Sequence, residues 1–193
     1  MKVGVLLLAA GRGTRFGSDK RRARLPDGTP LLERSIANLT ATGLPLRVAL
    51  GPGDDALAEA LAARGIDTLH CTDAPRGMGA TLAAAVGQLP AWDVVLVALG
   101  DMPWLRPASI TAVARAAGPD AICVPCHHGR RGHPVAFGRR FLPELAALDG
   151  DRGARDLLLR HAAAVREVPV DDPGIRRDVD RPADIAAAAG EAP

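Results

Sequence analysis

Glycines and basic side chains that follow a short apolar run could bind a phosphate group. The run, residues 3–10, ends at Gly11, and Gly13, Arg15 and Lys20 follow within ten residues. Glycines let backbone N–H groups approach phosphate oxygens, and Arg and Lys side chains neutralise phosphate charge. A buried strand that leads into such a loop is therefore predicted to bind phosphate.

Two common phosphate-binding loops do not match this segment. A Walker A loop requires Gly-Lys-Ser/Thr, which does not occur in the chain. The Rossmann fingerprint G-x-G-x-x-G fits Gly11 and Gly13 but has Phe16 where the third glycine is required. Because dinucleotide loops rarely carry both an Arg and a Lys, the segment favours a more highly charged ligand, such as a nucleoside triphosphate.

Carboxylates occur at two places that could complete such a site. Asp101 follows the apolar run 94–99 directly, in the segment GDMP, and Asp180 precedes Pro182 near the end of the chain. A carboxylate at the carboxyl end of a parallel strand lies where α/β sheets bind their ligands. Considered alone, Asp101 could equally belong to a turn, and Asp180 could cap a helix that begins at Pro182.

The elements that must position these residues alternate along the chain. Apolar runs predict strands, helical periodicity predicts the segments between them, and this alternation indicates a parallel α/β sheet. The expected strands are residues 3–10, 46–50, 66–70, 94–99 and 121–124. The expected helices begin at Pro30 after a Thr29 cap, cover 55–64 after an Asp54 cap, follow residue 82, and cover about 107–117.

The later part of the chain is less regular. We expect a loop at 126–133, a strand at 134–137, helices near 139–148 and 151–162, and a strand at 165–168 that is a candidate to pair antiparallel at the sheet edge. A final helix is expected from Pro182. No repeat or linker divides the chain, so residues 1–193 are predicted to form one domain, with 186–193 as a frayed tail.

Composition limits the classes of function. The net charge is only +2, yet six of the 24 basic residues and a single acid fall in residues 12–24, which suits a small polyanion. Aromatic residues make up 3% of the chain, too few for the stacking that single-stranded nucleic acid requires. No stretch is long enough to span a membrane. Three cysteines without a disulfide pattern, and an N-terminus that fits a buried strand better than a signal peptide, indicate a cytoplasmic protein.

Residues 8–20, LAAGRGTRFGSDK, are similar to the signature L-A-A-G-x-G-x-R-x-G-x-x-K of the sugar-nucleotidyltransferase-like superfamily. Within it they resemble the molybdenum cofactor nucleotidyltransferases. Four further segments resemble motifs of that family in the same order: residues 77–82, 100–103, 131–135 and 178–185. The resemblance implies a three-layer α/β/α fold with a mostly parallel, Rossmann-like sheet of the nucleotidyltransferase type and a small antiparallel edge.

The resemblance also implies roles for individual residues. Lys20, Arg15 and Asp101 would be catalytic, and Asp101 and Asp180 would hold Mg²⁺, although Arg181 stands where the family usually has Thr. His133 would lie on the acceptor side, unless it is only a turn residue. The residues implied to bind the nucleotide are Leu8, Ala9, Ala10, Gly11, Arg12, Gly13, Asp73, Gly77 and Gly79.

The implied reaction transfers CMP from CTP to the phosphate of molybdenum-bearing molybdopterin, with release of pyrophosphate. Ala9-Ala10 and the segment GMGATL resemble the cytidylyl subgroup; transfer from GTP or to another phosphate is the alternative. A hypothesis from another class is an accessory protein that binds nucleotide and serves a molybdoenzyme or its chaperone. Arg21, Arg22 and Arg24 replace residues that are usually apolar, so they could bind a more anionic acceptor or form solvated surface. Neither nucleic acid nor a membrane is an expected partner.

Overall fold

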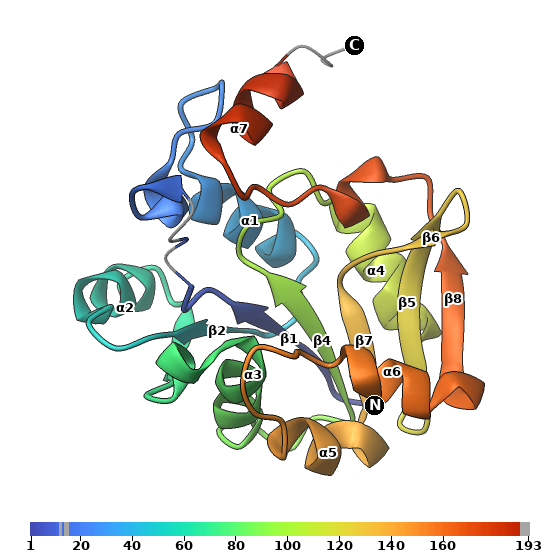
Figure 1. The fold of residues 1–193 in the computed structure, drawn as a ribbon. Helices are drawn as coiled ribbons and strands as arrows, with labels where there is room; N and C mark the ends of the chain where they lie inside the picture. The colour runs from blue at the N-terminus through green and yellow to red at the C-terminus, as the bar shows by residue number, and fades with distance from the viewer. Residues whose placement is uncertain (12, 14–15, 190–193) are drawn as a thin grey trace.

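The computed structural model describes residues 1–11, 13 and 16–189. Eight strands form one sheet, with helices on both of its faces (Figure 1). The strands are β1 (Val3–Leu8), β2 (Leu46–Leu50), β3 (Asp67–His70), β4 (Val94–Leu99), β5 (Ile122–His127), β6 (Arg130–Arg131), β7 (Val135–Gly138) and β8 (Val165–Pro169). The α-helices are α1 (Leu31–Thr40), α2 (Asp55–Ala62), α3 (Met78–Val86), α4 (Pro107–Ala116), α5 (Leu142–Ala146), α6 (Arg155–Arg160) and α7 (Pro182–Ala189).

The sheet is mostly parallel, and its strands run in the order β3-β2-β1-β4-β7-β5-β6, with β8 also paired to β5. Strands β3, β2, β1 and β4 are parallel to one another. Strand β7 is antiparallel to both β4 and β5, and the two-residue β6 is antiparallel to β5 at the edge. The predicted mostly parallel α/β sheet with helices on both faces is confirmed.

The orientation expected for the last strand was wrong. β8 pairs with β5 in parallel, from Ile122 opposite Val165 to Cys126 opposite Pro169. The antiparallel strand inside the sheet is instead β7, which lies between β4 and β5. The loop expected at 126–133 also contains the end of β5 and the short β6.

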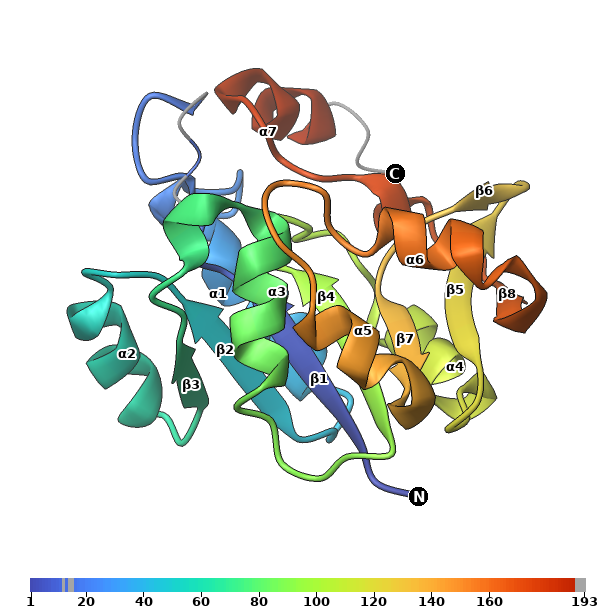
Figure 2. The ribbon, with the colours of Figure 1, turned by 60° about the horizontal axis from the view of Figure 1, so that its bottom comes forward.

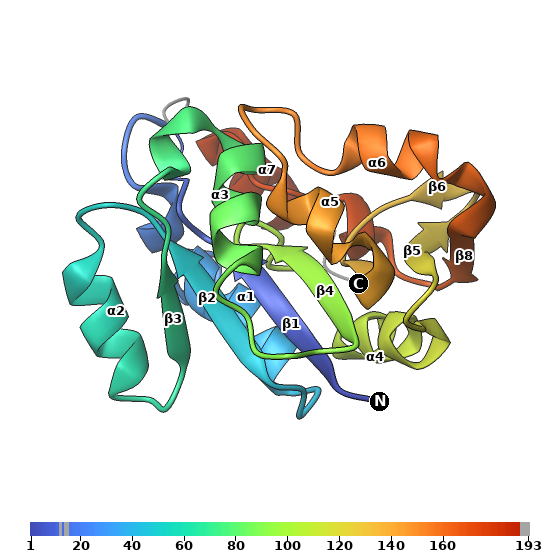
Figure 3. The ribbon, with the colours of Figure 1, turned by 90° about the horizontal axis from the view of Figure 1, so that it is seen from below.

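The core consists of two apolar layers, one on each face of the sheet, against which the helices pack. Every residue from Val94 to Ala98 is buried, because both faces of this central strand are covered. On one face, α1, α2 and α4 contribute Leu32, Leu61, Ile110 and other residues; on the opposite face, α3, α5 and α6 contribute Leu82, Leu145 and Leu157. Figure 3 shows α3, α5 and α6 along one side of the sheet and α4 along the other.

The parallel strands β1 and β4 place their carboxyl ends at the same edge of the sheet. From β1 the order continues to β2 on one side and to β4 on the other, so this edge is a switch point where α/β proteins bind ligands. The segment that leads into α7 crosses over this edge (Figures 1 and 2). Helix α7 extends to Ala189, so residues 186–189 are helical. Among the described residues, no helix has the length and apolar character needed to cross a bilayer.

Candidate active site

A cleft of about 580 Å³ lies at the switch point, between the loop after β1 and the segments after β4 and before α7. Many of the residues expected from the sequence line it: residues 8–11, Gly13, Lys20, Gly77, Asp101 and Asp180. Arg12, Thr14 and Arg15 lie outside the described residues. The cleft therefore brings together both expected carboxylates and the described part of the loop between Ala9 and Lys20, called the phosphate loop below because the sequence predicts that it binds phosphate.

Lys20 joins the two carboxylates. Its Nζ donates a hydrogen bond to Asp101 Oδ2 at 2.7 Å and lies 3.6 Å from Asp180 Oδ1. It also donates to the backbone oxygen of Val179 at 3.1 Å. The Lys20 side chain is only 12% exposed, so this charge is held in place and is not free in solvent.

The backbone fixes Lys20 and Asp101 before any ligand binds. A side chain at Gly13 would approach the Lys20 stem to 2.7 Å, so the absence of one lets this stem pass across the loop. Gly100 N–H donates to Leu8 O at 2.9 Å, and Val179 N–H donates to Asp101 O at 2.9 Å. These bonds join the ends of β1 and β4 and the segment before α7.

Asp101 has one oxygen that no protein group satisfies. Its Oδ1 is buried and has no hydrogen-bond partner among the described residues. A buried carboxylate oxygen without a partner is costly, which indicates that a ligand completes the site. Mg²⁺ usually takes one or two carboxylates, with water and substrate phosphates as its other ligands. Asp101 and Asp180 could supply these two carboxylates. Within the described part of the chain, no three His, Cys, Asp or Glu side chains are grouped so that they could hold a metal ion by themselves.

The charges that line the cleft also favour a bound cation. Four carboxylates line it, those of Asp101, Asp151, Asp178 and Asp180, against the described bases Lys20 and Arg21. Because like charges repel, a triphosphate could approach these carboxylates only with a cation between them. Asp178 begins the motif at 178–185 but was given no role of its own from the sequence, and nothing in the local pattern of Asp151 distinguishes it from a turn residue.

The segment that carries Asp180 is anchored from outside the cleft. The buried Asp172 carboxylate accepts hydrogen bonds from Arg106 N–H at 2.9 Å, Ser109 Oγ at 2.7 Å and Gly174 N–H at 2.8 Å. At the other end, Asp184 Oδ2 accepts from the N–H groups of Asp180 and Arg181, at 2.8 and 2.7 Å. These two backbone hydrogen bonds lower the pKa of Asp184. The carboxylate that caps α7 is thus Asp184, and Asp180 remains directed at Lys20.

The glycines before and in α3 have a structural role of their own. Gly79 N–H donates to Gly150 O at 2.7 Å, so this donor is already used. A side chain at Gly79 would lie 2.8 Å from Asp149 O, which means that the loop 149–151 packs directly on the helix. Gly77 lines the cleft, whereas Gly79 is not among the described residues that line it. Asp73 is exposed beside Arg76 in a separate shallow hollow and not in the cleft.

A second cavity of about 500 Å³ adjoins the cleft, and Leu8, Met78, Leu99 and Asp178 line both. Its walls are largely apolar, with Arg131, Arg155 and Arg176 among the residues that line it. His133 lines this cavity and not the cleft, among the described residues. Burial lowers the pKa of His133 despite the nearby charges of Asp101 and Asp178, so its imidazole is neutral at neutral pH.

The basic residues after Lys20 differ in burial and in their hydrogen bonds. Arg21 is buried and bonded to Asp19 and Asp54 on the wall of the cleft, while Arg22 and Arg24 are exposed and Arg24 donates to Gly28 O. Arg21 is therefore neither solvated nor free to bind an acceptor. Asp54 precedes α2 but makes no capping hydrogen bond to it, because its carboxylate is used by Arg21 and Gly51 N–H.

The loop after β1, Lys20 and two converging carboxylates, at the switch point of a mostly parallel sheet, form the arrangement that the sequence predicts for a domain of the nucleotidyltransferase type. Residues 5–165 match the family described as the MobA-like NTP transferase domain. The chain belongs to this family.

Two curated proteins are similar in sequence to part of this chain. The chain is 34% identical over 137 residues to the bifunctional protein GlmU of Ralstonia pickettii, covering 70% of this chain and 30% of that protein. It is 37% identical over 119 residues to a probable molybdenum cofactor guanylyltransferase of Chloroflexus aggregans, covering 60% and 53%. The chain thus spans about a third to a half of the length of these curated relatives.

Solved structures resemble the whole chain. Rv0371c from Mycobacterium tuberculosis H37Rv superposes with a TM-score of 0.85 at 30% identity, covering 100% of both chains. A complex of the same protein with manganese superposes with a TM-score of 0.81 at 27% identity, covering 97% of each chain.

Proposed function

We propose that this protein transfers CMP from CTP to the terminal phosphate of molybdopterin that carries molybdenum, and releases pyrophosphate. The observation that carries the proposal is the convergence of Lys20, Asp101 and Asp180, with one buried Asp101 oxygen left for a ligand. The nucleotide would occupy the polar cleft, and the acceptor would occupy the adjoining apolar cavity.

The chemistry requires little more than positioning and charge neutralisation. An acceptor phosphate has a second pKa of about 6, so it is largely deprotonated at neutral pH and needs no general base. One of its oxygens would form a bond to the α-phosphorus of the nucleotide. The bond from that phosphorus to the bridging oxygen would break, and this oxygen would leave with pyrophosphate.

Each side chain then has a defined task. Lys20 would offset negative charge on the α-phosphate and the leaving pyrophosphate, and Arg15 and the backbone of residues 9–13 would cradle the β- and γ-phosphates. Mg²⁺ bound by Asp101 and Asp180 would neutralise charge at the reacting phosphate; the manganese complex of the similar Rv0371c supports a divalent cation. Gly77 would border the nucleotide, with Gly79 and Asp73 supporting that loop.

The adjoining cavity suits an acceptor that has an apolar body and an anionic end. Apolar side chains such as Val97, Val124 and Phe137 line it, together with three arginines. His133, neutral at neutral pH, would contact the acceptor as a hydrogen-bonding group and not as a charge.

A second candidate is the same reaction with GTP. The relative from Chloroflexus aggregans, named as a probable guanylyltransferase, favours it, whereas Ala9-Ala10 and residues 77–82 favour CTP. A nucleotide-binding accessory protein for a molybdoenzyme or its chaperone is the alternative without turnover. The paired carboxylates and Lys20 favour the enzyme.

The test is pyrophosphate release from CTP and from GTP, with molybdopterin and Mg²⁺, against ATP and UTP as controls. We expect release that depends on both the acceptor and the metal, and that is faster with CTP. Faster release with GTP would move the assignment to guanylyl transfer. Binding of CTP or GTP without release, under any of these conditions, would support the accessory protein.

A further inference from the structure

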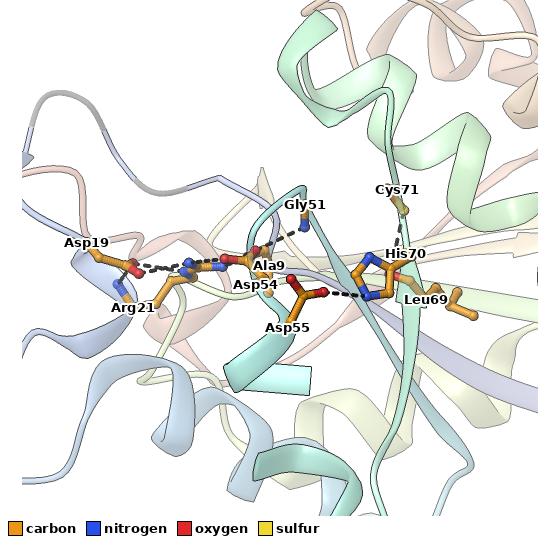
Figure 4. Close-up of polar contacts among 9 residues, drawn as sticks. All are labelled: Ala9, Asp19, Arg21, Gly51, Asp54, Asp55, Leu69, His70 and Cys71. Atoms are coloured by element: carbon orange, nitrogen blue, oxygen red, sulfur yellow. Dashed lines mark hydrogen bonds and ion pairs between the residues drawn. The ribbon is translucent and has the colours of Figure 1, made fainter. Parts of the chain in front are cut away.

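Arg21 uses every hydrogen-bond donor of its guanidinium group inside the protein. Nε and Nη2 donate to the two Asp19 oxygens at 2.8 Å each. Nη1 and Nη2 donate to the two Asp54 oxygens at 2.7 and 2.8 Å, and Nη1 also donates to Ala9 O at 2.9 Å. Figure 4 shows the guanidinium between the two carboxylates, with Ala9 and Gly51 beside them.

These bonds join both ends of the phosphate loop to a turn more than thirty residues further along the chain. Ala9 directly follows β1, at the start of the phosphate loop, and Asp19 is where the loop ends, directly before Lys20. Asp54 lies in the turn between β2 and α2, where it also accepts from Gly51 N–H at 3.0 Å. Ala9 N–H in turn donates to Ala49 O at 3.0 Å. One side chain thus holds both ends of the phosphate loop against the neighbouring turn.

The group is buried and remains charged. Arg21 is 6% exposed and Asp54 is 3% exposed. Burial alone would lower the pKa of Arg21, but the hydrogen bonds that Arg21 donates to Asp54 and Asp19 outweigh it and raise the pKa. With two carboxylates around one guanidinium, this charge is fully compensated within the protein. Arg21 therefore contributes geometry to the cleft and no free positive charge.

We propose that Arg21 is a positioning residue that holds the two ends of the phosphate loop, Ala9 and Asp19, against Asp54 in the arrangement that binds the nucleotide. The ligand assignment rests on the proposed function. Lys20 is the neighbour of Arg21 in the same short 3-10 turn, Lys20–Arg22, so the bonds of Arg21 also fix the point from which Lys20 reaches Asp101. A loop that is ordered in advance loses less conformational entropy on binding.

Lysine could not replace this arrangement. An ammonium group has three donors and acts as a point charge, whereas the planar guanidinium binds two carboxylates side by side and a carbonyl as well. In an Arg21→Lys variant, Ala9 and Asp19 would be held in their binding arrangement only part of the time. The apparent dissociation constant of the nucleotide would then rise by the inverse of that fraction.

The experiment measures nucleotide binding by calorimetry, with CTP and GTP in the presence of Mg²⁺, and turnover at saturating nucleotide. For Arg21→Lys we expect a dissociation constant that is at least about tenfold higher, while kcat at saturation stays within about threefold, because the bound nucleotide then orders the loop. Arg22→Lys makes the same substitution at the adjacent exposed residue. It should bind nucleotide as the unsubstituted protein does.

A second variant keeps the test informative if Arg21→Lys does not fold. Asp19→Asn leaves the buried pair of Arg21 and Asp54 in place and changes only the carboxylate at the end of the loop, which is 26% exposed. It should raise the dissociation constant severalfold with little change in the unfolding midpoint.

The possible outcomes separate this inference from the proposed function. If the unsubstituted protein binds neither CTP nor GTP, the proposed function fails and this inference fails with it. If it binds nucleotide and both variants bind equally well, only the role of Arg21 is overturned. A lower unfolding midpoint with unchanged nucleotide affinity would likewise show that Arg21 only stabilises the fold.

Discussion

Asp101 combines a fixed position with one carboxylate oxygen that is left for a ligand. One of its oxygens pairs with Lys20, and the backbone on both sides of it is hydrogen-bonded to β1 and to the segment before α7. The other oxygen is buried without a partner among the described residues. An unsatisfied oxygen costs stability, and a ligand that supplies the missing interaction would account for its persistence.

Substitution of Asp101 tests whether this oxygen serves a ligand. In Asp101→Asn the side chain keeps its shape but loses the charge, so pyrophosphate release should fall by about 10²- to 10³-fold or more. The unfolding midpoint should change by no more than a few degrees, because the buried oxygen without a partner no longer carries a charge. The control Asp120→Asn changes an exposed carboxylate away from the cleft and should leave both quantities unchanged. Full activity in Asp101→Asn would remove this residue from the mechanism.

The thiol of Cys71 should be inert at neutral pH. Burial, and then the charge of Asp73, raise the pKa of this group from 9.0 to about 11. At pH 8 only about 0.1% of it would be thiolate, which is the reactive form. Alkylation of the folded protein, followed by mass spectrometry, should show labelling at Cys71 that rises about tenfold per pH unit up to about pH 11. Rapid labelling at pH 8 would show that the thiolate is stabilised.

At the scale of elements, the site depends on contacts between segments that carry no chemistry themselves. Helix α3 and the loop 149–151 touch through backbone atoms, and Asp172 ties the segment before α7 to the start of α4. Figure 2 shows α3 and α5 lying side by side. The walls of the cleft are therefore held by packing on one face of the sheet and by a buried carboxylate on the other.

A methyl group at Gly79 should disturb this packing. It would lie 2.8 Å from Asp149 O and 2.9 Å from Gly150 O, which are backbone atoms that cannot simply turn away. Gly79→Ala should lower the free energy of unfolding by about 1 to 3 kcal/mol, measured by chemical denaturation. Gly118→Ala, where a methyl group would meet nothing within 4 Å, is the matched control. Equal stability of the two variants would mean that the loop moves freely.

At the scale of the whole molecule, two adjoining cavities of different character meet at Leu8, Met78, Leu99 and Asp178. One is bordered by the phosphate loop and carboxylates, and the other by apolar side chains and arginines. Under the proposed function, this division would let the nucleotide and the acceptor bind next to each other, so occupancy of the two cavities can be tested separately.

A bulky side chain in the apolar cavity should block only one of the two substrates. Ala154 is partly buried and lines that cavity but not the cleft, among the described residues. Ala154→Phe should abolish pyrophosphate release with molybdopterin and leave the dissociation constant of CTP within about twofold, because nucleotide contacts are untouched. The exposed Ala63 offers Ala63→Phe as a control for the added ring. Loss of CTP binding in Ala154→Phe alone would place the nucleotide in this cavity instead.

Local patterns in the sequence predict the bounds of some strands and the residues that line the cleft. β4 has the expected bounds because an unbroken apolar run that ends at a glycine is typical of a buried strand, and Lys20, Asp101 and Asp180 lie together as their motifs indicate. The pairing of β8 could not be predicted, because a strand's direction depends on partners far along the chain. Arg21 looks like Arg22 in the sequence, since its partner Asp54 is 33 residues away.

The place of β7 between β4 and β5 has a consequence for biosynthesis. β5 emerges from the ribosome before β7, yet its link to β4 in the sheet runs through β7. Until residue 138 has been made, the apolar β4 keeps an open edge that could pair with other chains, which nascent-chain chaperones would need to shield. Asp180 follows later still, so the two carboxylates that flank Lys20 can come together only after every strand of the sheet has been synthesised.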